Sequence, residues 1–227
     1  MRTKLALAAT LAGFAFAPAV QADDGRFYAS IGGGLSAPSS SSMNFLRTNN
    51  APHLTHTTFA TGWTGLGAVG YQAAEGYRVE LEGGYRQSRV AHMDAGTATG
   101  NRAVLSVMGN SLVDLYSNSA FRIYGGAGLG AAWVKLHNVQ GTPSATLVGA
   151  LPVFDDSSPP VFQYQAILGL NYPVSKAASV FAEYRYVGTT AAQFESAALA
   201  GARLTGDKPA THNMVVGFRF FLDGNSK

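Results

Sequence analysis

The chain has 227 residues, enough for one large all-β domain or two small domains. Charged residues make up only 13% of it, about half the share typical of soluble domains, whereas aromatic residues reach 11% and glycine occurs 27 times. The formal charge of +3 falls by two, to +1, without Arg2 and Lys4, which argues against a nucleic-acid partner. The absence of cysteine excludes a disulfide framework and thiolate chemistry.

The N-terminus has the pattern of a secretory signal peptide. Positive charge at Arg2 and Lys4 precedes an almost wholly apolar stretch over residues 5–16, and Val20 and Ala22 suit the positions before a cleavage site. We predict cleavage after Ala22; the alternative is a buried core helix. The expected division is a signal peptide over residues 1–22 and a β-barrel over residues 23–227, with a short tail at 223–227. The apolar stretch is shorter than the roughly 18–20 residues of a membrane-spanning helix, and no later stretch reaches that length.

Beyond residue 26, apolar and polar residues alternate with a period of two, which predicts β-strands. The segments are longer than the strands usual in soluble proteins and long enough to cross a bilayer at a tilt. Eight strands are expected, over Phe27–Ser36, Phe59–Tyr71, Tyr77–Arg89, Arg102–Tyr116, Phe121–Leu136, Phe162–Tyr172, Ser179–Gly188 and His212–Leu222.

The connections between these strands alternate in length. Four are long and rich in Ser, Thr, Gly, Pro and Ala, at 37–58, 90–101, 137–161 and 189–211. Three are tight, at 72–76, 117–120 and 173–178. Long outer loops alternating with short periplasmic turns are typical of bacterial outer-membrane barrels.

The two faces of each predicted strand differ sharply. In the strand from Tyr77, Val79 and Leu81 alternate with Glu80 and Glu82. A barrel of eight strands has an interior just wide enough for side chains, and it could not hold the many Tyr, Phe, Leu and Trp residues of the apolar face. We therefore expect the apolar face to point towards lipid and the polar face inwards, where glycine leaves room for Arg and Glu.

Aromatic residues cluster near the ends of the predicted strands. Tyr and Trp favour the headgroup level of a membrane, so two girdles are expected; the alternative is that aromatic residues simply favour strands. The girdle at the tight turns would comprise Phe27, Tyr71, Tyr77, Tyr116, Phe121, Tyr172 and Phe220. The girdle at the long loops would comprise Trp63, Trp133, Phe162, Tyr164 and Tyr186.

A sheet inside the hydrocarbon layer of a membrane can have no free edge, because each unpaired backbone N–H or C=O costs several kcal/mol there. The first strand must therefore pair with the last, and both termini must lie on the side of the tight turns. The predicted fold class is all-β, a closed eight-stranded antiparallel transmembrane β-barrel with four long outer loops and three short periplasmic turns.

The polar face carries a set of charged residues that would share the narrow lumen. They are Arg78, Glu80, Glu82, Arg86, Arg102, Asp114, Arg122, Glu183, Arg185 and Arg219. Isolated buried charges are very costly, so Glu80, Glu82 and Glu183 are expected to pair with neighbouring arginines. Two interpretations follow: a salt-bridged plug that closes the barrel, or a narrow conducting path whose excess of arginine would favour anions.

Several segments are similar to those of a known family. Phe27-Tyr-Ala-Ser-Ile-Gly-Gly-Gly, Val180-Phe-Ala-Glu-Tyr-Arg-Tyr-Val-Gly-Thr and Val216-Gly-Phe-Arg-Phe-Phe-Leu resemble the outer-membrane β-barrel family of the OmpA transmembrane domain, neisserial opacity proteins and alphaproteobacterial surface antigens. The resemblance implies that Gly217, Phe220 and Leu222 form the signal read by the barrel-assembly machinery. The chain departs from this pattern by continuing past the last strand instead of finishing on a terminal Phe. The resemblance also implies adhesion or immune recognition through the long loops.

Other motifs carry little chemistry. His53 and His56 form H-x-x-H in a predicted Thr/Pro-rich loop with no acid nearby, and His92 and His212 have no evident serine partner. The glycine-rich run 125–130 continues as a strand, whereas a phosphate-binding loop would need a helix. The adjacent carboxylates at 155–156 lack the further ligands of a Ca²⁺ site. No metal and no cofactor is predicted.

The sequence therefore predicts a monomeric outer-membrane protein with a structural and surface role. Its expected partners are outer-membrane lipid and lipopolysaccharide, the assembly machinery, and a host ligand at the loops. A small porin is the second interpretation. A barrel enzyme acting on lipid A or peptides is the third, and the chain is not expected to be an enzyme.

Overall fold

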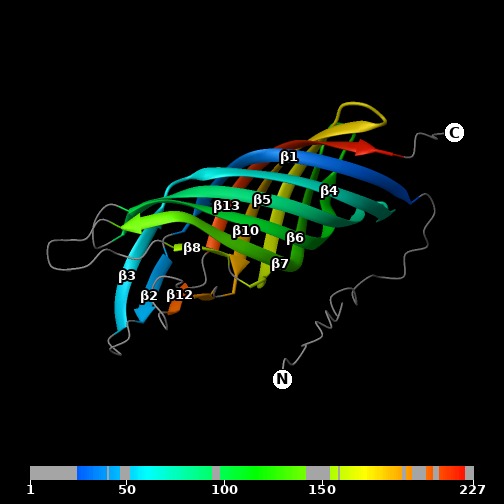
Figure 1. The fold of residues 1–227 in the computed structure, drawn as a ribbon. Helices are drawn as coiled ribbons and strands as arrows, with labels where there is room; N and C mark the ends of the chain where they lie inside the picture. Colours follow the sequence, from blue (N-terminus) through cyan, green and yellow to red (C-terminus); the bar gives the residue numbers. More distant parts are fainter. Residues whose placement is uncertain are drawn as a thin grey trace, which may run out of the picture.

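The computed structural model describes residues 25–39, 41–46, 52–93, 98–141, 154–157, 159–190, 193–195, 203–206 and 210–222. Eight long strands curve into a barrel (Figure 1). They are β1 (Arg26–Pro38), β4 (Gly62–Ala74), β5 (Tyr77–Met93), β6 (Ala98–Ser117), β7 (Arg122–Gly141), β9 (Val161–Pro173), β10 (Ala178–Thr189) and β13 (Ala210–Phe221). Five shorter strands lie in the connections, β2 (Ser41–Leu46), β3 (Pro52–Phe59), β8 (Phe154–Ser157), β11 (Gln193–Glu195) and β12 (Arg203–Gly206).

The barrel closes between its first and last strands. β1 pairs antiparallel with β4 on one side and with β13 on the other, from Tyr28↔Phe221 to Pro38↔Thr211. The predicted closure and antiparallel order are confirmed. Following paired residues once around the barrel leads from Tyr28 back to Pro38, ten residues along the same strand. With eight strands about 4.8 Å apart, this stagger sets a strand tilt of roughly 40°.

The predicted strand positions agree with the structure to within a few residues, but several strands continue further at the loop end. β5 extends to Met93, β6 begins at Ala98, and β7 reaches Gly141. The segments 37–58, 137–161 and 189–211, predicted as loops, contain β2, β8, β11, β12 and all of β3 except Phe59, which was predicted to begin the second barrel strand. These short strands lack a sustained alternation of apolar and polar residues, on which the prediction depends.

The three tight turns have local causes. In the β4–β5 turn, Gly76 adopts a φ of +76°, a left-handed conformation that suits glycine. In the β6–β7 turn, the side-chain oxygen of Asn118 accepts hydrogen bonds from the backbone N–H groups of Ala120 and Phe121, at 2.9 and 2.7 Å. In the β9–β10 turn, Ser175 Oγ accepts from Ala177 and Ala178. Asn and Ser favour turns because their side chains accept hydrogen bonds from backbone N–H groups that have no partner on a neighbouring strand.

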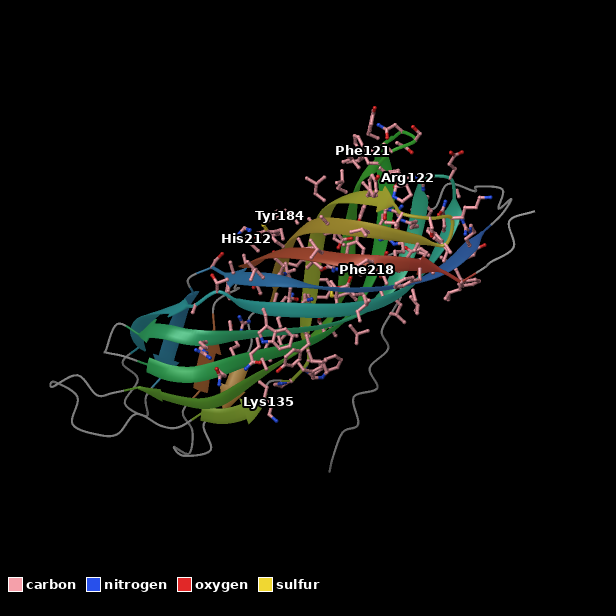
Figure 2. The ribbon with its side chains drawn as sticks, turned by 90° about the horizontal axis from the view of Figure 1, so that it is seen from above. Phe121, Arg122, Lys135, Tyr184, His212 and Phe218 are labelled. Carbon is pink, nitrogen blue, oxygen red and sulfur yellow. The ribbon has the colours of Figure 1, made fainter. Side chains whose placement is uncertain are left out.

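The outer surface of the barrel is apolar on every one of its eight strands. Ile31 on β1 is 63% exposed, Leu81 on β5 is 58% and Leu129 on β7 is 52%. Figure 2 shows Tyr184 and Phe218 on this outer surface, with His212 beside Tyr184. A continuous apolar belt of this kind is far larger than the patches that soluble monomers expose, so it fits a lipid environment.

The residues of the predicted girdles all lie on this outward face. Neighbouring members contact one another across strands: the ring centroids of Phe27 and Tyr71 are 4.8 Å apart, and those of Tyr116 and Phe121 are 5.7 Å apart. At the loop end, Trp63 lies against Tyr85, at 5.3 Å. The others, Tyr77, Trp133, Phe162, Tyr164, Tyr172, Tyr186 and Phe220, are half-buried or exposed. A position at the headgroup level stays a prediction.

Among the described residues, no helix has the length and apolar character needed to span a membrane. The predicted signal peptide and the tail at 223–227 lie outside the described residues.

Candidate functional site: the polar interior of the barrel

The centre of the lumen is held by one arginine between two carboxylates. Arg185, on β10, contacts Glu183 at 2.5 Å and Glu82, from β5, at 2.6 Å. All three side chains are almost fully buried. Strand alternation places Glu183 and Arg185 two positions apart on the same face, and the barrel curvature brings Glu82 to them from another strand. Asn110 donates a further hydrogen bond to Glu82 at 2.9 Å.

Nearer the tight turns, a second group combines charge with aromatic rings. Arg219 contacts Glu80 at 3.3 Å, and Tyr28 donates its hydroxyl to the same carboxylate at 2.8 Å. Tyr124 donates to Glu183 at 2.6 Å, which connects this group to the central one. The Arg219 guanidinium also lies over the rings of Tyr28, Tyr124 and Phe181, at 5.0, 5.7 and 5.3 Å from their centroids. Cations over aromatic faces are stabilised by the ring quadrupole, more strongly when water is excluded.

The lumen ends at a third ion pair beside the tight turns. Arg78 contacts Asp114 at 3.0 Å, and both side chains are buried. Arg122 lies 4.0 Å from the same carboxylate, but its side chain is 40% exposed. Arg122 therefore lies on the rim of the barrel. The prediction that it lies in the lumen is wrong. Its position follows from the sequence, since it is the first residue of β7.

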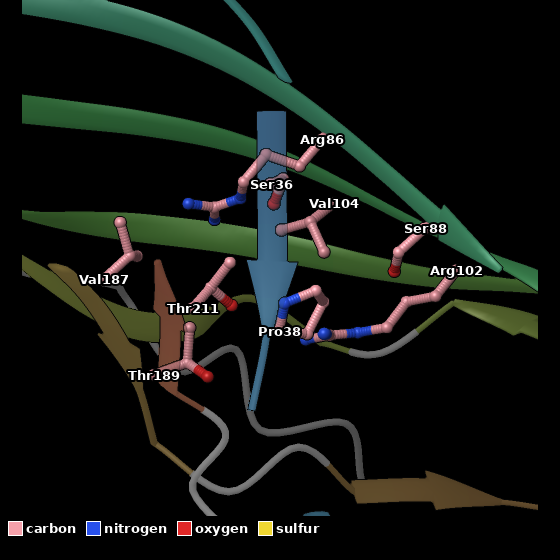
Figure 3. Close-up of a pocket in the computed structure, with 9 residues that line it drawn as sticks. All are labelled: Ser36, Pro38, Arg86, Ser88, Arg102, Val104, Val187, Thr189 and Thr211. Carbon is pink, nitrogen blue, oxygen red and sulfur yellow. The ribbon is translucent and has the colours of Figure 1, made fainter. Parts of the chain in front are cut away.

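At the loop end, the described interior consists of arginine, amide and hydroxyl side chains. Arg86 donates a hydrogen bond to the side-chain oxygen of Gln163, and Gln165 donates to Asn110 at 2.7 Å. Arg86 and Arg102 line a pocket there, together with Ser36, Ser88, Thr189 and Thr211. Figure 3 shows both guanidinium groups extending into the space among these residues. Among the residues that the structure describes, the lining includes two arginines and no carboxylate.

Two tyrosines, Tyr28 and Tyr124, belong to this network but are missing from the predicted lumen set. Both are fully buried, and both occupy positions that the alternation along their strands assigns to the polar face. A glycine lies under each ring, because a Cβ atom added at Gly70 would collide with Tyr28 and one added at Gly169 would collide with Tyr124. The alternation in the sequence places both tyrosines on the polar face. Which glycine lies under each ring depends on the register between neighbouring strands, and the sequence alone does not give that register.

The interior is filled. A water-filled channel leaves the side chains that line it accessible to water, whereas Tyr28, Met108, Tyr124, Phe181 and Arg219 are between 0 and 2% exposed. These residues come from five different strands and close the lumen between the loop-end pocket and the tight turns. The arrangement favours the plug over the conducting path.

The other sequence motifs add nothing to this interior. His212 points outward, with its Nδ1 atom 2.6 Å from the Tyr184 hydroxyl. The run 125–130 lies within β7, as expected for a strand. The side chains at positions 53, 56, 92 and 155–156 lie outside those that the structure describes. Of the predicted assembly signal, Gly217 faces inward while Phe220 and Leu222 face outward; recognition of these residues stays a prediction.

Comparisons with known proteins agree with this architecture. The family model of the outer membrane protein β-barrel domain matches residues 6–220. A Rickettsia conorii protein named as a candidate adhesin is 27% identical over 173 residues, covering 70% of this chain and 68% of that protein.

Two solved barrels share the fold. Neisserial surface protein A, NspA, superposes with a TM-score of 0.54 at 14% identity, covering 87% of this chain and 99% of NspA. OprG of Pseudomonas aeruginosa gives 0.53 at 18%, covering 86% and 96%. At these identities the solved structures show the fold alone. The family match extends over nearly the whole chain, and the protein therefore belongs to the outer membrane protein β-barrel domain family.

Proposed function

We propose that this protein is a surface protein of the outer membrane that binds a partner outside the cell through its loop-end strands. The observation that carries the proposal is the filled interior of the described barrel, because buried tyrosine, phenylalanine and paired arginine occupy the space that a passage for solutes would need. The exposed, variable part of such a protein is its outer loops, where binding residues commonly lie on a rigid scaffold.

The loop-end strands support this proposal because they join two separate connections into one sheet. β2 and β3 form a hairpin between β1 and β4, and β3 pairs with the end of β5. β12, from the connection between β10 and β13, pairs with β2 from Arg203↔Leu46 to Gly206↔Met43, and β11 pairs with β12. Figure 1 shows β2, β3 and β12 gathered at one end of the barrel. A continuous sheet can present an extended binding surface in a fixed orientation.

The name of the Rickettsia conorii relative, a candidate adhesin, agrees with a binding role. A small porin remains the second interpretation, and it conflicts with the filled lumen. A barrel enzyme is the third; the described interior holds arginine, carboxylate and tyrosine groups that are already paired with one another.

The test is replacement of the loop-end sheet. One variant replaces residues 41–58 by a short Gly/Ser turn, and a second replaces residues 193–206 in the same way. Bacteria that express either variant are expected to lose most of the attachment to host epithelial cells that the wild-type chain confers. A control variant with residues 118–120 replaced, at the opposite end of the barrel, should attach like the wild type.

Folding of each variant is checked by the change in gel mobility on boiling, which reports an intact barrel. Full attachment by both folded variants would contradict the proposal. An equal loss in the control variant would show that the assay reports barrel quantity instead of loop binding.

A further inference from the structure

The outward face of the barrel carries few ionisable side chains other than tyrosine, and they are grouped at one end. On the eight barrel strands, the described outward-facing side chains include three basic groups, Arg89 on β5, Lys135 on β7 and His212 on β13, and no carboxylate. All three are exposed and lie in the loop-end half of their strands. Figure 2 shows Lys135 on the outer side of the barrel. The basic groups on the described lipid-facing surface are therefore confined to its outer end.

Arg89 and Lys135 lie at nearly the same depth in the membrane. Register connects Lys135 through Ala103 to Gln87, so Lys135 is two residues nearer the tight turns than Arg89 when paired residues are followed from β5 to β7. The paired positions themselves rise towards the loop end by ten residues around the eight strands, or about 2.5 residues from β5 to β7. The two displacements nearly cancel, and the two cations are level.

Aromatic rings lie on the membrane side of both cations. Tyr85 precedes Arg89 by four positions on the same face of β5, and Trp133 precedes Lys135 by two positions on the same face of β7. The Tyr85 ring contacts that of Trp63, with 5.3 Å between the centroids. Tyr and Trp favour the boundary between hydrocarbon and headgroups, so side chains just outside them meet the headgroups of the outer leaflet. This step rests on the predicted girdle at the long loops.

The spacing of the two cations suits two anionic groups on one headgroup. Two strand separations of about 4.8 Å and two residues of about 3.4 Å place the Cα atoms of Arg89 and Lys135 roughly 12 Å apart. Both side chains are long and bind phosphate, the guanidinium through two parallel donors and the ammonium as a point charge. Asn101 of β6 pairs with Arg89, faces outward between the two cations and offers an amide for sugar hydroxyls.

We propose that Arg89 and Lys135 form a clamp on the outer surface of the barrel for the phosphorylated sugar headgroup of an outer-leaflet glycolipid. Each cation contacts one phosphate, and Asn101 contacts the sugar between them. The acyl chains extend past Trp133 along the apolar face. The partner is a lipid with two phosphates on its sugars, which is the chemistry of the lipid A part of lipopolysaccharide. The clamp faces lipid and does not depend on the proposed adhesion through the loop-end sheet.

The test uses the full mature chain, refolded in a maltoside detergent that carries no phosphate. Diphosphoryl lipid A, monophosphoryl lipid A and phosphatidylcholine are titrated in turn, and bound lipid is counted by native mass spectrometry. The diphosphoryl form is expected to bind roughly tenfold more tightly than the monophosphoryl form, because the latter offers one phosphate to two cations. Equal affinity for the two forms, or for phosphatidylcholine, would overturn the proposal. Displacement by an equal concentration of inorganic phosphate would overturn the lipid as the source of the phosphate.

The variants separate the clamp from net charge. Arg89→Gln and Lys135→Gln are each expected to weaken binding of diphosphoryl lipid A roughly tenfold and to remove its advantage over the monophosphoryl form, since each leaves one cation for two phosphates. Lys176→Gln removes the same charge from an exposed position in the β9–β10 turn, at the opposite end of the barrel, and should bind like the wild type.

Folding of each variant is checked by the mobility shift on boiling, and the two lipid A forms decide the question on the wild-type chain alone should a variant fail to fold. Unchanged affinity in a folded chain with both Arg89→Gln and Lys135→Gln would overturn the clamp, as would occur if loop carboxylates already occupy these cations. A loss in Lys176→Gln as large as in Arg89→Gln would overturn it equally. Attachment of the loop variants to host cells has no bearing on these results, so the two proposals fail separately.

Discussion

Single residues in the interior derive their importance from burial. Arg185 is held by Glu82 and Glu183 at 2.6 and 2.5 Å, where little water reaches any of the three side chains. A buried ion pair stabilises little in total, but removal of one partner leaves uncompensated charge and is strongly destabilising. Arg122 makes a similar contact with Asp114 at 4.0 Å while 40% exposed, and exposed pairs contribute little.

We expect Arg185→Met to lower the free energy of unfolding by about 3–5 kcal/mol, because it leaves Glu82 and Glu183 buried side by side. Arg122→Met, the same substitution on the rim, should lower it by less than about 1 kcal/mol. The measurement is urea unfolding in lipid vesicles, followed by tryptophan fluorescence. Equal losses for the two variants would mean that burial does not govern these pairs.

Neighbouring strands pack by placing large side chains of one strand over glycines of the next. The Tyr124 ring, from β7, occupies the space over Gly169 of β9, and this position lets its hydroxyl reach Glu183 of β10. Outward glycines differ: at Gly83 of β5, an added Cβ atom would have its nearest neighbour, the Gly67 carbonyl oxygen, at 4.0 Å. Glycine is therefore a packing requirement at inward positions such as Gly169 and dispensable at outward Gly83.

Gly169→Ala is expected to cost about 1–3 kcal/mol of stability, because the new methyl group displaces the Tyr124 ring and breaks its hydrogen bond to Glu183. Gly83→Ala should leave stability unchanged or slightly increased, since alanine loses less backbone freedom than glycine when it folds. Thermal midpoints from the gel mobility shift compare the two variants directly. A midpoint for Gly169→Ala at or above the wild-type value would contradict this role of the tyrosine.

The whole molecule combines a lipid-facing outer surface with a filled lumen. Closure between β1 and β13 removes the sheet edge, and the tilt of the strands sets an interior only as wide as its side chains. The four buried carboxylates contact arginines because the narrow lumen brings these side chains together. These features agree with the proposed role of the barrel as a support for the loop-end strands.

We therefore expect the refolded mature chain to produce no steady conductance steps in a planar lipid bilayer. A mobility shift on boiling, together with fluorescence of Trp63 and Trp133 typical of a lipid environment, would show that the silent protein is folded and inserted. Steady steps with preference for anions would restore the porin interpretation and would mean that the interior opens in the membrane.

The sequence by itself determined the barrel, because membrane strands must alternate and their polar backbone must close on itself. The positions of Glu82, Glu183 and Arg185 on the inner face follow from that alternation alone. Only the tertiary structure decided which charges meet across strands, since Glu82 lies 103 residues from Arg185 in the chain and their contact depends on a stagger that no local pattern encodes. The same reason explains why Tyr28, Tyr124 and the pocket at Arg86 and Arg102 emerge only in the folded molecule: each is assembled across strands, by register and curvature.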